Sequence, residues 1–152
     1  MPIFNFKFTV DAALADVVDF HYQSNVKSLT PPPIIVQLHK YEPLGEGSLA
    51  DFTMWLGPLP LRWKVVHSDV SQEGFTDTQL EGPLQRWQHQ HRFTALDKST
   101  TEVSEHIEYA YKPGLFGLFS RLLFSAPALT FLFTARKMIT RRKVRQRVSS
   151  YA

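Results

Sequence analysis

The chain has 152 residues, 43% of them hydrophobic and 20% charged, which fits one globular domain with a sizeable core and excludes a disordered chain. It has no cysteine, which excludes disulfides, thiolate metal sites and a cysteine nucleophile and accords with a reducing compartment. The formal net charge is +3, and the N-terminus lacks the pattern of a secretory signal, so we expect a cytoplasmic protein. The expected domain covers residues 1–147, followed by a short tail over residues 148–152.

The first thirty residues predict a strand and then a helical segment. Residues 3–10 alternate apolar and polar side chains, as a half-buried strand does. Asp11 offers a side-chain acceptor for the free N–H groups of a helix expected from Ala12, and residues 24–29 predict a further helical turn. The run Thr30-Pro31-Pro32-Pro33 ends this segment, because proline lacks an N–H group and restricts the residue before it.

The middle of the chain predicts a procession of strands separated by short turns. The expected strands cover residues 34–40, 47–56, 61–72, 75–81, 86–96 and 101–111. Because the turns are short, adjacent strands should pair antiparallel as a meander. A stretch of about thirty residues from Leu115, interrupted only by Pro127, then predicts a long C-terminal helix.

This order of elements predicts an α+β fold in which a curved antiparallel sheet of about seven strands wraps around the long helix. The helix is the one element able to cover the concave face of the sheet, and the short helices should close one end. Space between the sheet and the helix can hold side chains or a ligand.

Several local motifs follow one another along nearly the whole chain. They are residues 29–32 (LTPP), 60–63 (PLRW), 75–79 (FTDTQ), 82–83 (GP), 87–93 (WQHQHRF) and 105–109 (EHIEY). Together they resemble bacterial members of the SRPBCC superfamily of helix-grip proteins, which includes START lipid-transfer domains, the birch pollen allergen group and polyketide cyclases. Glu105 stands where the family pattern has an aspartate. The resemblance implies a ligand-binding cavity but no single reaction, because members range from carriers to cyclases and dehydratases.

Strand alternation predicts which side chains face such a cavity. On the strand expected over residues 86–96, His89 and His91 share one face with two aromatic side chains, and this face is the candidate inward face. An apolar wall with a few polar groups suits a partly polar ligand. The predicted ligand-contacting residues are Trp55, Trp63, Phe75, Gln79, Trp87, His89, His91, Phe93, Tyr109, Leu118 and Leu122.

Two histidines and two carboxylates are the candidate catalytic residues. His89 and His91 can serve as general acid or base, since imidazole titrates near neutral pH, and Asp77 or Glu105 can fix their tautomers. The structural alternative is that the histidines simply hydrogen-bond the carboxylates across the strands, because buried polar groups need partners. The His-x-His spacing alone is weak support for a metal, so we expect no metal and no cofactor. For Arg62, pairing with a sheet carboxylate is favoured over binding a ligand, and Trp63 is expected to pack in the core.

The C-terminal third raises the question of a membrane. Residues 115–135 carry only one charge, Arg121, but this cation and Pro127 weigh against a transmembrane helix, and a helix buried against a sheet looks equally apolar. Residues 109–152 have nine basic and no acidic residues, whereas residues 1–108 have eight basic and fourteen acidic residues. The basic end can contact an anionic membrane, pair with the acidic body of the domain or be a solvated helix end. The cations concerned are Arg136, Lys137, Arg141, Arg142, Lys143, Arg145 and Arg147.

Three functions remain open from the sequence. The leading one is binding or carrying a hydrophobic small molecule such as a lipid, an isoprenoid or a polyketide-like compound. The alternatives are a cyclase or dehydratase that uses the histidines and carboxylates, and a membrane-peripheral module that uses the basic end. Nucleic acid is not an expected partner, because the basic stretch lacks interleaved aromatic side chains for stacking on bases.

Overall fold

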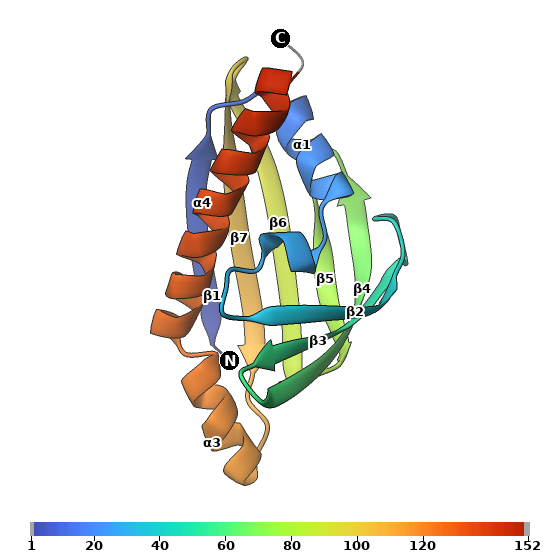
Figure 1. The fold of residues 1–152 in the computed structure, drawn as a ribbon, viewed down its shortest axis with the longest axis vertical. Helices are drawn as coiled ribbons and strands as arrows, with labels where there is room; N and C mark the ends of the chain where they lie inside the picture. Colours follow the sequence, from blue (N-terminus) through green and yellow to red (C-terminus); the bar gives the residue numbers. More distant parts are fainter. Residues whose placement is uncertain (1, 151–152) are drawn as a thin grey trace.

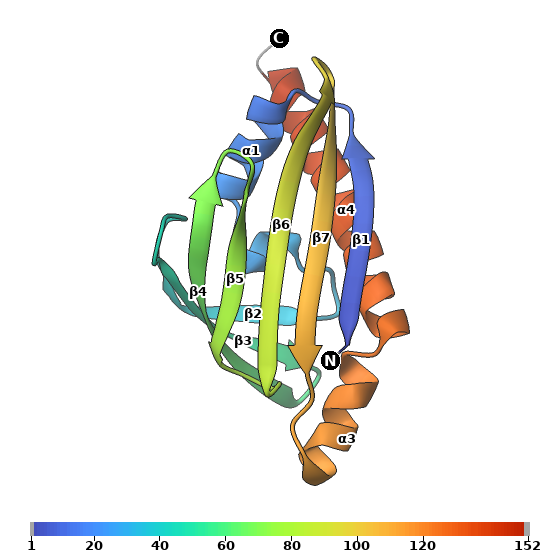
Figure 2. The same ribbon diagram turned by 180° about the vertical axis from the view of Figure 1, so that it is seen from behind.

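A computed structural model describes residues 2–150, in which seven antiparallel strands form one strongly curled sheet (Figures 1 and 2). Neighbouring strands follow the order β1-β7-β6-β5-β4-β3-β2, so the chain runs as a meander from β2 to β7, and β1 closes the far edge. The strands are β1 (Ile3–Val10), β2 (Ile35–Tyr41), β3 (Leu49–Leu56), β4 (Leu59–Ser71), β5 (Gly74–Glu81), β6 (Arg86–Asp97) and β7 (Thr100–Ala110). The predicted α+β helix-grip fold is confirmed, and the six meander strands begin and end within two residues of their expected bounds.

Four helices complete the fold of the described residues. They are α1 (Leu14–Gln23), α2 (Val26–Leu29), α3 (Gly114–Leu123) and α4 (Ala126–Ser150). Figure 1 shows α4 lying along the concave side of the sheet beside β1, while α1 and α2 cover the same side farther from β1. β2 and β3 cross the direction of the other strands steeply, which curls the sheet toward α4 (Figures 1 and 2).

The expected helix start was wrong by two residues. α1 begins at Leu14 with Ala13 at its N-cap, and no side chain caps it. The reason is a tight turn after β1, in which the Ala12 N–H donates to the carbonyl of Val10 at 2.9 Å and Ala12 is buried. Asp11 therefore lies within the turn. α2, in contrast, has a reciprocal cap between Asn25 and Ser28.

The expected single C-terminal helix is divided into α3 and α4, which meet at an angle of 44°. The break lies at Phe124, whose ring packs into the core against Trp63 and Trp87, while its carbonyl accepts a hydrogen bond from the Tyr111 hydroxyl at 2.9 Å. Pro127 follows in the first turn of α4, where a missing N–H group costs nothing. A continuous helix would set the Pro127 ring against the Leu123 carbonyl, so Pro127 and the burial of Phe124 together divide the helix at this point.

The buried stripe of α4 holds the helix to the sheet. Leu129, Phe133, Thr140 and Val144 are buried at helical spacing on the face toward the sheet. α4 continues to Ser150, so residues 148–150 belong to this helix, and residues 151–152 of the expected tail lie outside the described residues. No single helix among residues 2–150 has the length and hydropathy to cross a membrane, and only the bent pair α3 and α4 meets both criteria jointly.

Candidate functional site

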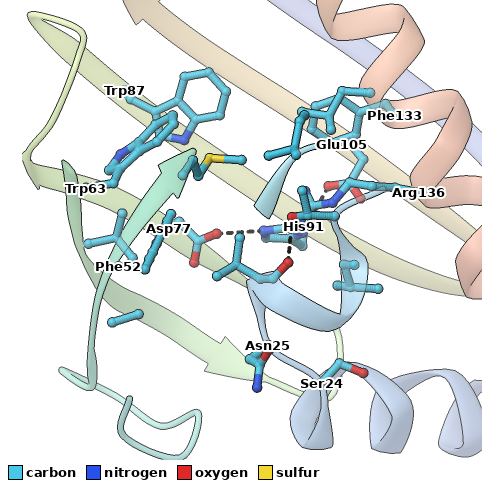
Figure 3. A pocket seen from close by; sticks show the side chains of 18 of the residues that line it. Ser24, Asn25, Phe52, Trp63, Asp77, Trp87, His91, Glu105, Phe133 and Arg136 are labelled. Carbon is cyan, nitrogen blue, oxygen red and sulfur yellow. Dashed lines mark hydrogen bonds and ion pairs between the residues drawn. The ribbon is translucent and has the colours of Figure 1, made fainter. Parts of the chain in front are cut away.

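A cavity of about 390 Å³ lies between the concave face of the sheet, the α1–α2 segment and α4 (Figure 3). Most of its wall is apolar, with Phe52, Trp63, Trp87 and Leu129 among the lining side chains. Phe131 of α4 also lines the cavity and is 66% exposed, so the cavity opens beside the first turns of α4. The predicted cavity between sheet and helix is therefore present.

Figure 3 shows that polar and apolar side chains are unevenly distributed along this cavity. Trp63, Trp87 and Phe52 lie at one end, and His91, Glu105 and Arg136 lie at the other, with Asp77 between the two groups. The aromatic end is tightly packed, because the rings of Trp63 and Trp87 meet edge to face with their centroids 5.3 Å apart. The cavity thus has an apolar end and a polar end.

His91 lies between two carboxylates at the polar end. Its Nε2 donates to Asp77 Oδ2 at 2.9 Å, and its Nδ1 is 3.0 Å from Glu105 Oε2, an ion-pair distance without hydrogen-bond geometry. Glu105 Oε2 also accepts from His89 Nε2 at 2.7 Å. Strand register explains the cluster, because Asp77 pairs with His89 across β5 and β6, and His91 pairs with Glu105 across β6 and β7. The histidines therefore hydrogen-bond the carboxylates across the strands, as the structural alternative to a catalytic role predicted.

Burial and charge together set the protonation of this cluster. Burial lowers the pKa of His91, but the charges of Glu105 and Asp77 outweigh burial and raise it to about 9. Burial would raise the pKa of both carboxyl groups, yet the charges and hydrogen bonds of the neighbouring histidines hold both below their usual range. Burial and the charge of His91 lower the pKa of His89 to about 4. At neutral pH, His91 is a cation between two anions and His89 is neutral.

Two further histidines at the cavity wall had not been predicted. His67 Nε2 lies 3.1 Å from Asp77 Oδ1, and its Nδ1 contacts the Ser48 hydroxyl at 2.9 Å. His21 of α1 donates through Nδ1 to the Val17 carbonyl at 2.8 Å, which leaves Nε2 with the lone pair. Burial lowers the pKa of His21 to about 4, so its imidazole is neutral at pH 7. Neither histidine belongs to a motif, and only the alternation of β4 and the buried stripe of α1 point to them.

Arg136 also lines the cavity, although the sequence suggested a membrane-facing role for it. Its spacing from Phe133 and Thr140 places it on the buried stripe of α4. Other cations of the basic end bind their own domain: Arg141 donates to the Thr9 carbonyl, Lys143 to the Ser28 carbonyl, and Arg147 to the Gln23 side chain. These three cations thus contact the body of their own domain, but through neutral acceptors rather than the acidic side chains that the charge pattern suggested.

The predicted ligand-contacting residues divide into two groups. Those that line the cavity are Trp63, Phe75, Trp87 and His91, together with the carboxylates Asp77 and Glu105. The others, which are absent from the lining, are Trp55, Gln79, His89, Phe93, Tyr109, Leu118 and Leu122.

Each of these departures has a local cause. Trp55 lies on the outer face of β3, because Met54 and Leu56 line the cavity and side chains alternate. Gln79 turns to donate to the Leu84 carbonyl at 2.8 Å. The others differ in burial: His89, Phe93 and Tyr109 are buried beneath or beside the cavity, whereas Leu118 and Leu122 are exposed on α3. Arg62 pairs with Asp51 at 2.8 Å, and Trp63 is buried, as expected.

Asp77, His89 and His91 also place potential metal-binding atoms within 4.8 Å of one another. The same atoms take part in the ion pairs and hydrogen bonds of the cluster. A metal needs imidazole nitrogens with free lone pairs. At neutral pH the protonated His91 has none, so a metal would have to displace its protons.

No protein-family model matches the chain. No curated protein matches it either. Solved structures match over almost its full length, among them an aromatase/cyclase from a Streptomyces species at 15% sequence identity, with a TM-score of 0.78, covering 97% of this chain and 95% of the other. A START superfamily protein from Mycobacterium smegmatis is 9% identical, with a TM-score of 0.70 and coverages of 95% and 97%. Norcoclaurine synthase from Thalictrum flavum is 18% identical, with a TM-score of 0.64 and coverages of 93% and 96%. The protein therefore has the START-like helix-grip fold that its sequence motifs predicted.

Proposed function

We propose that the protein binds a hydrophobic small molecule in its cavity and carries it without chemical change. The cavity itself is the observation that supports this proposal, because a volume of about 390 Å³ with mostly apolar walls is of the size that small-molecule sites have. Each square ångström of apolar ligand surface removed from water contributes about 25 cal/mol to binding. A lipid, an isoprenoid or a polyketide-like molecule has the required apolar body.

The two predicted catalytic histidines favour binding over proton-transfer chemistry, and His21, whose Nε2 keeps a lone pair at the cavity wall, is the remaining candidate base. A general base must hold a free lone pair within reach of the ligand. His91 faces the cavity but is protonated and engaged by two carboxylates, and His89 is hydrogen-bonded to Glu105 away from the cavity wall. The cyclase or dehydratase alternative has its support in the name of one similar structure, an aromatase/cyclase, rather than in this arrangement.

The direct test is native mass spectrometry of the freshly purified protein, followed by organic extraction and identification of any released molecule. We expect an added mass that disappears on extraction, with an apolar compound in the organic phase. Purified protein that carries no added mass and takes up no apolar compound from an offered lipid extract would contradict the proposal.

A second candidate function is contact of α3 with a membrane surface. Leu115, Leu118 and Leu122 recur at helical spacing and are 86%, 63% and 71% exposed, which is unusual for one side of a short helix. α3 carries no acidic residue, and its single charge, Arg121, is exposed. An apolar face with a cation suits the surface of an anionic bilayer. Because Phe124 follows α3 and lines the cavity, such contact would bring the cavity wall to the lipid.

Sedimentation with phosphatidylcholine vesicles containing phosphatidylserine tests this candidate. We expect the double variant Leu118→Ser, Leu122→Ser to lose most of the vesicle-bound fraction. The matched double variant Arg142→Gln, Arg145→Gln removes two exposed cations of α4 and should retain most of it. If only the arginine variant lost binding, the basic end of α4 would be the contact instead, and equal binding by all three proteins would reject both surfaces.

A further inference from the structure

The guanidinium group of Arg136 faces the cavity without a protein partner. Among residues 2–150, no hydrogen bond or ion pair holds it, and its Cζ lies 5.3 Å from the centroid of the Phe133 ring. Arg136 is partly exposed, yet burial among its neighbours lowers its pKa. A group that faces an internal hollow has both properties, and Arg136 is indeed part of the cavity lining.

The carboxylates nearest to Arg136 already have direct partners. Glu105 and Asp77 raise the pKa of Arg136 through their charges, but His91 contacts both of them at 3.0 and 2.9 Å. His67 contacts the other oxygen of Asp77, Oδ1, and His89 shares Glu105 Oε2 with His91. Arg136 therefore balances the charge of the cluster at a distance, while its five N–H donors remain unused.

In a mostly apolar cavity, guanidinium N–H groups without acceptors raise the free energy of the protein unless a ligand supplies acceptor atoms. A charged donor that is shielded from water and lacks a partner is destabilising. The planar guanidinium group binds oxygen atoms with one or two parallel hydrogen bonds. Figure 3 places Arg136 at the polar end of the cavity, opposite the Trp63 and Trp87 end, so one elongated molecule can meet both.

We propose that the cavity takes an amphipathic ligand whose apolar body lies against Trp63 and Trp87 and whose carbonyl or carboxylate oxygen accepts from Arg136. This inference rests on the proposed ligand-binding function and narrows the class of ligand. Hydroxyl-only or fully apolar molecules of the same size leave the guanidinium donors less well satisfied and bind more weakly.

The test is displacement of the neutral fluorophore N-phenyl-1-naphthylamine by three molecules of nearly equal shape. The first, 2-ethylnaphthalene, has no oxygen, 2-acetylnaphthalene has a neutral carbonyl group, and 2-naphthoate has a carboxylate. We expect at least one acceptor to bind about tenfold or more tightly than 2-ethylnaphthalene, because a hydrogen bond to a charged donor contributes about that factor. Comparison of the two acceptors identifies whether the oxygen is neutral or anionic.

The variant Arg136→Met keeps the length of the side chain and should abolish the advantage of the acceptors while leaving the affinity for 2-ethylnaphthalene unchanged. Arg142→Met, an exposed cation on the same helix, should retain the advantage. If the wild-type protein binds all three molecules equally, or if Arg136→Met preserves the preference, the inference is wrong although ligand binding stands. If the fluorophore and all three molecules fail to bind the wild type, the proposed function itself fails.

The wild-type comparison remains decisive when Arg136→Met folds poorly. In that case Arg136→Lys keeps the charge but offers three donors instead of the planar fork, and it should reduce the acceptor preference severalfold. A purely structural role for Arg136 predicts the opposite pattern, namely a lower unfolding temperature with an unchanged order of affinities.

Discussion

His91 donates a hydrogen bond from Nε2 to Asp77 Oδ2 at 2.9 Å across β6 and β5, at the polar end of the cavity. The same imidazole faces Glu105 from its other nitrogen at 3.0 Å, so one cation holds together two anions from different strands, the buried Glu105 and the partly buried Asp77. Burying the charges of such a cluster costs a large desolvation free energy, and removing one member leaves the charges of the others uncompensated. Its members are therefore sensitive positions for the stability of the domain.

Replacing Glu105 by glutamine should destabilise the fold strongly. The Glu105 side chain is buried, and the substitution leaves the His91 cation with one anion fewer and an amide beside it. Loss of one partner from a buried ion pair costs about 3–5 kcal/mol in the free energy of unfolding. Urea denaturation measures this loss in the free energy of unfolding. Glu108→Gln, on the same strand but more exposed, should change the free energy by less than about 1 kcal/mol. Similar losses for both variants would contradict the assigned roles.

The stability of the domain should peak near pH 6.5. His91 has a folded-state pKa of about 9, so its contribution is fully present below 6.5 and is lost as the pH rises from 6.5 to 9. His21 and His89 have pKa values of about 4, so the unfolded chain binds more protons than the folded one between pH 6.5 and 4, and stability falls as the pH decreases. Each proton by which the folded and unfolded states differ changes the slope of the unfolding free energy against pH by about 1.4 kcal/mol per pH unit.

Urea denaturation across pH 4–9 measures this profile. The variant His91→Gln should flatten the alkaline side while keeping a fall on the acid side. A wild-type profile that rises steadily from pH 6.5 to 9 would show that His91 is not the protonated centre of the cluster.

Gly74 should tolerate no side chain, because β5 approaches β6 closely at the site. It has φ +143°, and a Cβ atom there would lie 1.9 Å from the His91 carbonyl oxygen. We expect Gly74→Ala to lower the free energy of unfolding by about 2 kcal/mol or more, from strain and displacement of the strand. Gly45→Ala is the matched control, since its nearest heavy atom would be 3.9 Å away, and it should change stability little. An equal effect of both substitutions in thermal unfolding would refute the close approach.

Leu118 and Leu122 should not affect ligand affinity, although the sequence suggested them as ligand contacts. Both are exposed on α3, whereas Leu129 lines the cavity and is buried. Single changes of Leu118 or Leu122 to serine should leave the affinity for N-phenyl-1-naphthylamine within about twofold, and Leu129→Ala should weaken it by about tenfold, because part of the apolar wall is lost. A tenfold loss from Leu122→Ser in a fluorescence titration would mean that α3 folds over the cavity when ligand binds.

The strands and the part of the site that lies on the sheet could be predicted from the sequence. The reason is that the alternation of side chains along a strand is a local property. Alternation placed His91 on the candidate inward face, and antiparallel pairing of consecutive strands then brought Asp77 and Glu105 close to it. It could not distinguish His89, on the same face, from a cavity-lining residue. That difference depends on how far α4 stands off each point of the sheet.

The helical part of the site was less predictable. Arg136 lies among many cations, and only its position on the stripe of Phe133 and Thr140 separates it from neighbours that point outward. The break at Phe124 lies three residues before Pro127, whose ring would clash with the Leu123 carbonyl in a continuous helix, and a buried aromatic contact across the fold fixes where the chain turns. The place of that contact leaves no local signal, so the sequence did not show that Leu118 and Leu122 lie exposed on α3.

Ligand binding in the hollow between the sheet and α4 is tested most directly by a fluorescence titration with N-phenyl-1-naphthylamine. The titration compares the wild type with a variant whose cavity is filled and with a control variant. Ala50 of β3 is buried and faces the cavity, so Ala50→Phe places a ring inside it, whereas Ala95→Phe places the same ring on an exposed part of β6. We expect saturable binding by the wild type and by Ala95→Phe, and a loss of about tenfold or more in affinity for a folded Ala50→Phe. Unchanged binding by Ala50→Phe, or no binding by the wild type, would contradict the claim.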